Sequence, residues 1–237
     1  MGSVYRLTLR QVAGKWRLAI MTVLAAMPVV ISALMLSDKS APSVTEFEMA
    51  VLSAMLAGSI VPLVVLAIAA AAFGNEVEDR TLANLTLSPL PRWKIALPKV
   101  LAVITVAGPF IAASALATSY VAFLGDGSAM LAVTVSAIVA VVMYSSAFVW
   151  LGLASTQAIG IGLLYIVLWE GFFSEFVTGV RLLSIRHYSI AIMHAIDPRR
   201  FAEVDYPGLG AAVLLSSAVI FGFLLLSVRR LRRMDVP

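Results

Sequence analysis

Three short stretches of this chain hold the side chains that could do chemistry, and the longest is a charged loop. Read from Asn75, it is NEVEDRTLANLTLSPLPRWKIALPK. If the apolar run over 81–87 is helical, Leu82 and Leu85 share a face. The acids before the run favour a helix N-terminus, and Pro89 stops the helix. The pattern predicts a short helix that docks on a partner, although a solvated loop whose charges only fix topology also fits.

The second stretch is an acidic and aromatic group around residue 170. Glu170 is followed by Phe172 and Phe173, and Arg181 comes soon after. A charged side chain at the centre of a membrane costs about 2.5–3.5 kcal/mol, and less near its edge. We therefore expect Glu170, with the two phenylalanines, to line a pathway or outer gate, or to pair with Arg181. The alternative is that Glu170 only marks the boundary of an apolar helix.

The third stretch contains both histidines. His187 and His194 are seven residues apart and share a face on a continuous helix, with Asp197 nearby. Because no further ligand has a recognisable spacing, we expect no metal site. The chain has no cysteine, which excludes thiolate ligands and a cysteine nucleophile. Neither G-x-S-x-G, H-E-x-x-H nor a P-loop occurs, so we expect no enzyme and no ATP bound by this chain.

The composition is that of an integral membrane protein. Of the 237 residues, 61% are hydrophobic and 13% are charged, whereas soluble domains carry about 25% charge. No mixed stretch is long enough for a soluble domain, so we expect one all-α domain over residues 1–237. Nucleic acid is excluded as a partner because the basic residues gather at the ends of apolar stretches.

The apolar stretches predict six membrane spans. A helix needs about 20 apolar residues to cross a bilayer, and five uncharged windows are that long or longer. The window between Asp126 and Glu170 holds 43 residues, which is too long for one span. It should fold as two helices that turn near Ser155–Gln157. The predicted spans are residues 18–37, 50–74, 98–124, 129–153, 157–173 and 208–228.

The basic residues predict the orientation. The N-terminal segment, the loop 76–99 and the C-terminal tail each hold four of the 17 lysines and arginines, and the other side holds five. Because positive charge marks the cytoplasmic side, both termini should be cytoplasmic. The first apolar run is longer than the hydrophobic region of a signal peptide, so we expect a retained span in a multi-pass protein of a prokaryotic cell membrane.

The N-terminal segment has an apolar stripe at helical spacing. Tyr5, Leu9, Val12 and Trp16 recur at intervals of three or four residues, with arginines to one side. This predicts an amphipathic helix in the cytoplasmic membrane interface. A basic flank that only sets the topology is the simpler alternative.

The charged loop resembles the signature of the membrane subunits, or permeases, of ABC-2 type transporters. From Glu76 to Lys99 it reads E-x-E-x-x-T-L-x-x-L-x-x-x-P-x-x-R-W-x-I-x-x-x-K, with Arg80 and Pro98 where the family commonly has glycine. The resemblance implies that this loop is the coupling helix of a transporter. The residues it implicates in coupling are Glu76, Glu78, Asp79, Arg80, Thr81, Leu82, Leu85, Pro89, Arg92 and Lys99.

The resemblance extends to the architecture. Members of the family have six spans, an amphipathic N-terminal helix, a minimal turn between spans four and five, and short outer helices before the last span. Residues 174–207 hold an apolar stretch too short and interrupted to span a membrane. The resemblance implies that this segment is an outer helical hairpin that dips back into the membrane.

The implied function is that of the permease subunit of an ATP-driven exporter. Two copies of a separate ABC ATPase would bind ATP and Mg²⁺, and a second permease copy or a sister permease would complete the complex in the lipid bilayer. The apolar spans, whose frequent polar groups are only Ser, Thr and Tyr, favour a hydrophobic or amphiphilic cargo. An autonomous channel or secondary carrier, or a non-transporting membrane scaffold of such a complex, remains the alternative.

Overall fold

The structure, a computed structural model, describes residues 2–37, 43–78, 91–173, 184–201 and 206–233. No strand occurs in these ranges. Long apolar stretches fold as helices because a helix bonds each backbone N–H and C=O within its own segment, which an apolar environment requires. In chain order the helices are α1 (Gly2–Val12), α2 (Lys15–Ser37), α3 (Val44–Phe47), η1 (Glu48–Ile60), α4 (Val61–Glu78), α6 (Trp93–Phe123), α7 (Gly127–Ala154), α8 (Ala158–Leu164), η2 (Tyr165–Phe173), α11 (Ile185–Ile196) and α12 (Leu209–Arg233).

Five helical stretches are long and apolar enough to cross a membrane. Four are the single helices α2, α6, α7 and α12, and the fifth runs through α3, η1 and α4 over Val44–Phe73. They coincide with five of the predicted spans and confirm the transmembrane character of the chain. The predicted fifth span corresponds to α8 and η2, which have seven and nine residues. Together these residues are fewer than the about 20 that a membrane span needs, so the count of six spans stays a prediction.

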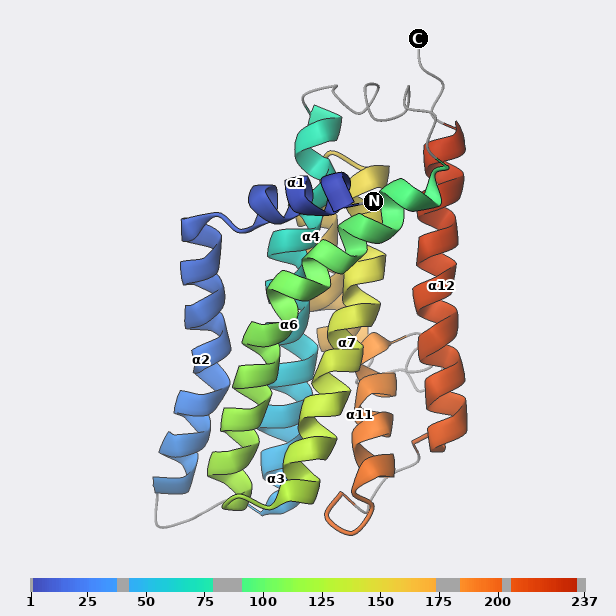
Figure 1. The fold of residues 1–237 in the computed structure, drawn as a ribbon. Helices are drawn as coiled ribbons and strands as arrows, with labels where there is room; N and C mark the ends of the chain where they lie inside the picture. The colour runs from blue at the N-terminus through green and yellow to red at the C-terminus, as the bar shows by residue number, and fades with distance from the viewer. Residues whose placement is uncertain (1, 38–42, 79–90, 174–183, 202–205, 234–237) are drawn as a thin grey trace.

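The long helices run side by side, and α1 lies across one end of them (Figure 1). This end, called the α1 end below, also holds the last turns of α4 and α12. The opposite end, called the α3 end, holds α3, the turn between α6 and α7, and the end of α11. The first and last described helices therefore meet the same end of the bundle, as the sequence predicts for the two termini.

Two tight turns connect the central helices. Between α6 and α7, Leu124 and Gly125 have φ angles of 51° and 81°, and Asp126 caps α7 by accepting a hydrogen bond from the N–H of Ser128. Glycine adopts this left-handed conformation without strain. Between α7 and α8, only Ser155–Gln157 interrupts the helix, at the position where the sequence predicts a turn.

The centre of the bundle is the contact of α4 with α7 and α8. Nearly all described side chains of α4 are buried. A Cβ added to Gly152 of α7 would lie 3.1 Å from the carbonyl oxygen of Ala70, and one added to Gly162 would lie 2.4 Å from a methyl carbon of Leu66. The missing side chains let the backbones of three helices approach closely, which is how small residues stabilise helix pairs in membranes.

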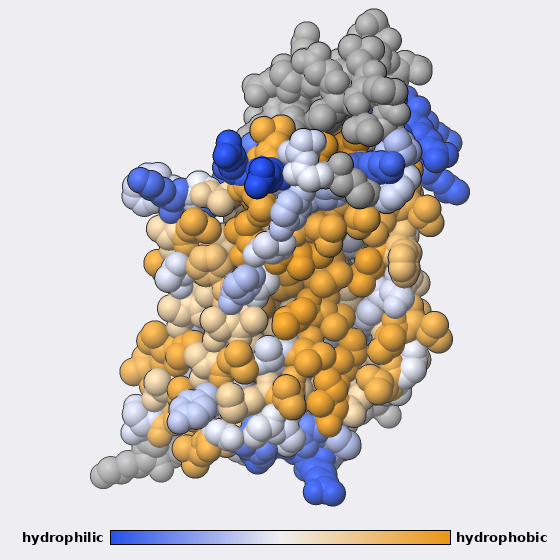
Figure 2. Space-filling model, viewed as in Figure 1, coloured by the Kyte–Doolittle hydropathy of each residue, from blue (hydrophilic) through white to orange (hydrophobic). Residues whose placement is uncertain are grey.

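The surface of the bundle is apolar around its middle. Apolar side chains cover this region and polar ones gather at the two ends (Figure 2). In α2 and α12 only 22% and 11% of the apolar window is buried. An exposed apolar surface of this extent is expected where lipid or another membrane protein covers it.

Two helical segments, η1 and η2, have the wider turn of a π-helix. They run over 13 and nine residues, whereas π geometry usually occurs as a single-turn bulge, often at a functional site. The first ends just before Pro62 of α4. The sequence does not predict this geometry. The two segments contact each other.

The predicted N-terminal stripe does not lie on one helix. Helix α1 ends at Val12 and Trp16 belongs to α2, where it is 83% exposed. The helix buries Val4, Thr8 and Val12, while Tyr5 and Leu9 are partly buried. The helix is interrupted at Ala13 and Gly14, where the chain turns from α1 into α2. The face of α1 that packs on the bundle therefore differs from the predicted apolar stripe.

Candidate functional site

The α1 end holds the described part of the predicted coupling segment. Lys99 of α6 is fully buried, and its Nζ donates a hydrogen bond to the carbonyl oxygen of Ala72 in α4. The same ammonium lies 4.3 Å from the ring centroid of Phe73, which is a favourable cation–π distance. Lys99 therefore ties together the two helices that flank the loop.

For most of the other predicted coupling residues, no side-chain contacts like those of Lys99 can be described. Glu76 and Glu78 belong to the last turns of α4, which extends beyond the predicted span end at residue 74. The helical backbone of α4 continues past the apolar run, so these two acids lie at the C-terminus of α4. The sequence predicts them only as acids that precede the short helix over 81–87. Arg92 is partly buried at the start of α6. The predicted residues Asp79, Arg80, Thr81, Leu82, Leu85 and Pro89 lie outside the described residues.

Helix α1 packs on α6 and α4 next to this segment. The hydroxyl of Tyr5 donates a 2.9 Å hydrogen bond to Oγ1 of Thr105 in α6. The guanidinium of Arg17 donates to the carbonyl oxygen of Gln11, which closes the turn between α1 and α2. The N-terminal helix is thus connected to the same helix that carries Lys99.

A second cluster surrounds Glu170, which is fully buried in η2. From described residues, its carboxylate accepts hydrogen bonds of 2.8 Å from the hydroxyl of Tyr165, 2.5 Å from the hydroxyl of Ser184 and 3.0 Å from the N–H of Ile185. Because a buried carboxylate is stable only when its oxygens are satisfied, these donors explain why the acid is tolerated here.

Arg186 connects this cluster to η1. Its Nε donates a 3.0 Å hydrogen bond to Oγ of Ser53, and its Nη1 donates a 3.2 Å bond to the main-chain oxygen of Glu170. A Cβ added to Gly58 would lie 3.1 Å from Cδ of Arg186, so this glycine leaves room for the arginine. The cluster therefore joins α11 to both π-helical segments.

Aromatic rings enclose the cluster on the side of α7. Tyr144 stacks on Phe148 at 5.6 Å and 20°, and Phe148 meets Tyr165 edge-on. The hydroxyl of Tyr144 is buried without a hydrogen-bond partner in the described structure. Of the other residues predicted beside Glu170, Phe172 and Phe173 are exposed, and Arg181 lies outside the described residues. Of the predicted residues that the structure describes, the acid belongs to the buried cluster and the phenylalanines do not.

Sequence reasoning missed five members of this cluster. They come from four different elements, and their sequence separations reach 133 residues. The one usable signal was Arg186, a charged residue in an apolar segment, which must find a polar partner. The missed residues are Ser53, Tyr144, Tyr165, Ser184 and Arg186.

The α3 end is held together by polar pairs. His194 of α11 pairs with Glu48 at the start of η1. The hydroxyl of Ser128 donates a 2.9 Å hydrogen bond to Asp197, and Arg200 pairs with Asp126 at 2.5 Å. Hydrogen bonds from the side chain and N–H of Ser128, together with the charge of Arg200, hold the pKa of the Asp126 carboxyl below its ordinary value.

Acid is expected to weaken the α3 end. Because the folded-state pKa of Asp126 is depressed, its carboxylate contributes its full stabilisation above the ordinary value of 3.8, and the contribution is lost as the pH falls through the folded value. In Asp126→Asn this part of the acid dependence should disappear. Melting temperatures of both proteins in detergent, measured from neutral pH to below pH 3.8, check this, and an unchanged acid dependence in the variant would contradict it.

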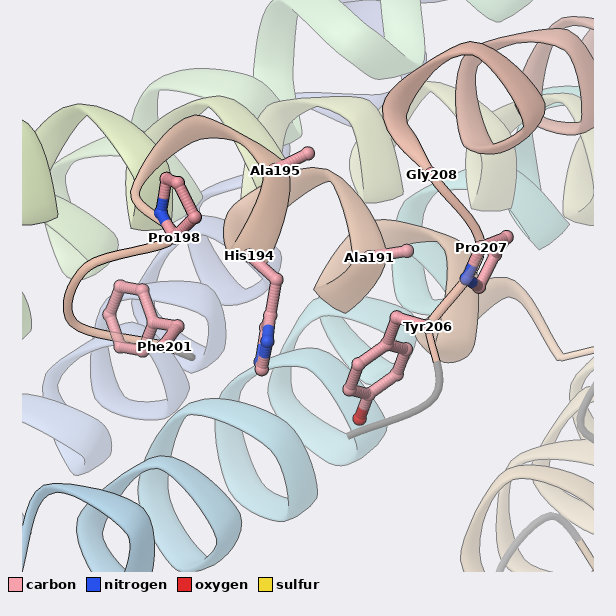
Figure 3. Close-up of a pocket in the computed structure, with 8 residues that line it drawn as sticks. All are labelled: Ala191, His194, Ala195, Pro198, Phe201, Tyr206, Pro207 and Gly208. Carbon is pink, nitrogen blue, oxygen red and sulfur yellow. The ribbon is translucent and has the colours of Figure 1, made fainter. Parts of the chain in front are cut away.

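An open pocket of about 220 Å³ lies between the end of α11 and the start of α12 (Figure 3). The rings of His194, Phe201 and Tyr206 line it, and His194 and Tyr206 point to the same side. Their ring centroids are 4.7 Å apart. Small-molecule sites usually have volumes of about 300–1,000 Å³, and the imidazole already pairs with Glu48. The pocket is therefore a weaker candidate than the two clusters.

Comparison with known proteins identifies no family for this chain, because no family model and no curated protein matches it. The candidate sites therefore depend on the geometry described above. They are the helix pair tied by Lys99 at the α1 end and the buried cluster around Glu170.

Proposed function

We propose that this chain is the membrane-spanning subunit of an ATP-driven exporter of the ABC-2 type, powered by a separate ATPase that docks on the loop between α4 and α6. The observation that carries the proposal is the buried Lys99, which joins α6 to Ala72 of α4. Lys99 is also the last residue of the stretch whose sequence resembles the family signature. A force on the loop would reach both helices together, because they are tied at its base.

The α1 end is proposed to face the cytoplasm. Helix α1, the start of α2 and the end of α12 lie at this end. Helix α1 lies across the bundle and not along it, as an interfacial helix would. Basic residues near membrane ends mark the cytoplasmic side; among the described residues at this end are Arg6, Arg10, Lys15, Arg17, Arg92, Lys94, Lys99, Arg229, Arg230, Arg232 and Arg233.

The proposed complex holds two ATPase subunits, with their ATP and Mg²⁺, and a second permease copy or a sister permease. The exposed apolar faces of α2, α12 and the α8–η2 unit would contact lipid or that second copy. The cargo is proposed to be hydrophobic or amphiphilic, because the spans are apolar apart from scattered hydroxyl groups. Robust transport of a highly charged solute would contradict this part of the proposal.

Charged residues on the apolar face of the loop should abolish coupling. In a Leu82→Asp, Leu85→Asp variant we expect insertion into the membrane to be normal and ATP hydrolysis by the purified complex to fall at least about 30-fold, since central apolar anchors of an interface contribute about 2 kcal/mol or more. ATP hydrolysis per mole of permease, measured in complexes purified from native membranes, checks this.

Asn84→Asp is the matched control, because on the helix that the sequence predicts here Asn84 would lie on a different face from Leu82 and Leu85. It should hydrolyse ATP at nearly the wild-type rate. If the leucine variant also keeps the wild-type rate, the loop is not the docking site.

An autonomous secondary carrier is the second candidate, and the fully buried Glu170 favours it. Carriers coupled to protons or ions commonly place an ionisable group inside the membrane. In this case substrate movement in vesicles would follow a pH gradient without ATP, and would be lost in Glu170→Gln. A non-transporting scaffold would bind the ATPase but would move no substrate in response to ATP or to a pH gradient.

A further inference from the structure

Helix α11 is a short helix whose first turn is buried inside the bundle. It has 12 residues and runs from the interior to the α3 end (Figure 1). Ser184 and Ile185 at its start are both buried. An isolated helix of this length is marginally stable, and the first N–H groups of any helix lack partners within it. The position of α11 therefore depends on the groups that bind its buried end.

Glu170 supplies most of these groups. Its carboxylate accepts from the hydroxyl of Ser184 at 2.5 Å and from the N–H of Ile185 at 3.0 Å, while Ser184 in turn caps the N–H of His187. Hydrogen bonds to a charged acceptor are stronger than neutral ones. A negative charge at a helix N-terminus is further stabilised by the helix dipole.

Arg186 makes the second connection of this first turn. It donates to Ser53 of η1 and to the main chain of Glu170 in η2. The buried end of α11 is therefore bonded to both wide helices through Arg186, whose side chain is partly buried. At the other end, His194 of α11 pairs with Glu48, and these side chains are 10% and 14% exposed. Just after the helix, Asp197 accepts from Ser128, and Arg200 pairs with Asp126 through side chains that are about one-third exposed. Such partly exposed pairs are worth less than buried ones.

We infer that Glu170 is the positioning residue that docks α11, and that α11 can undock as a unit while the long helices remain packed. Undocking would open a path from the α3 end to the interior of the bundle. The inference goes beyond the proposed function, because it concerns a moving part of this chain and holds for a carrier as well as for an exporter.

The absence of cysteine makes a direct test possible. Met193 of α11 and Met143 of α7 are 1% and 0% exposed, so Met193→Cys and Met143→Cys place one buried thiol on each helix. Each is combined with Glu170→Met, which removes the acceptor of the bonds from Tyr165, Ser184 and Ile185. The rate of modification by a cationic methanethiosulfonate reagent then reports the opening of each helix in the full-length protein in lipid vesicles.

In Glu170→Met the thiol at position 193 should react at least about tenfold faster than in the parent, because α11 loses the acceptor for its first turn. Glu170→Gln should give an intermediate rate, since its amide oxygen can still accept from Tyr165 and Ile185. The thiol at position 143 should stay protected in all of them. Glu46→Met, which removes an exposed carboxylate of α3, should leave both rates unchanged.

Two outcomes would overturn the inference. Equal rates at position 193 with and without Glu170 would show that the carboxylate does not dock α11. Equal acceleration at positions 193 and 143 would show that Glu170 supports the whole bundle. If Glu170→Met does not insert, Ser184→Ala removes the hydroxyl at the start of α11 that donates to the carboxylate, and removes no charge. It should accelerate position 193 alone, and no acceleration there would also overturn the inference.

Discussion

A Lys99→Met variant is expected to fold and insert normally yet to hydrolyse ATP in its complex at least about tenfold more slowly. Methionine is one heavy atom shorter than lysine and cannot donate to the carbonyl oxygen of Ala72. The variant removes the cost of burying a charge but leaves that carbonyl without this donor, so the two effects on stability oppose each other. The variant therefore separates stability from coupling, which a truncation to alanine would not do.

Lys94→Met is the matched control for this experiment. Lys94 lies on the same helix, one turn earlier, and its ammonium is 5.6 Å from the ring of Trp93 without being buried. It should keep the wild-type rate of ATP hydrolysis. Melting temperature and ATP hydrolysis are measured on each purified complex; if Lys99→Met and Lys94→Met hydrolyse ATP equally well, the tie between α4 and α6 does not transmit force from the loop.

Alanine at Gly162 is expected to destabilise the protein by about 1–3 kcal/mol, the usual cost of overpacking a core. The new Cβ would lie 2.4 Å from a methyl carbon of Leu66, and Leu66 of α4 is itself buried. Leu66 must therefore change its rotamer, or α8 must move away from α4. Either change loosens the centre of the bundle.

Gly160→Ala, on the same helix, is a control for which we expect a change in stability of the opposite sign. A Cβ at this position meets nothing within 4 Å, and alanine is favoured over glycine in a helix by about 0.5–1 kcal/mol. Gly160→Ala should therefore raise the melting temperature in detergent while Gly162→Ala lowers it. A decrease of equal size in both variants would mean that α8 does not pack on α4 at Gly162.

The long helices could be predicted from the sequence because apolar length is a local property. The windows for α2, α6, α7 and α12 agree with the structure to within a few residues, and the turn at Ser155 follows from the most polar point of a long apolar stretch. Helix α4 extends further than predicted because backbone hydrogen bonding continues beyond the last apolar residue.

The partners of the buried charges could not be predicted, because they depend on how the chain folds back on itself. Glu170 was identified as a costly acid, but its donors come from η2 and from the start of α11. Ser53, which binds Arg186, has no distinguishing sequence signal. The wide turns of η1 and η2 and the break before Trp16 likewise depend on packing and not on periodicity.

The proposed ATPase partner is tested most directly by purifying the tagged chain from its native membranes in a mild detergent and identifying the copurifying proteins by mass spectrometry. We expect a P-loop ATPase in a one-to-one ratio, retained in Asn84→Asp and lost in the Leu82→Asp, Leu85→Asp variant. If the chain purifies alone or only with copies of itself, it is not a subunit of an ATP-driven exporter, and the buried Glu170 becomes the basis for a carrier.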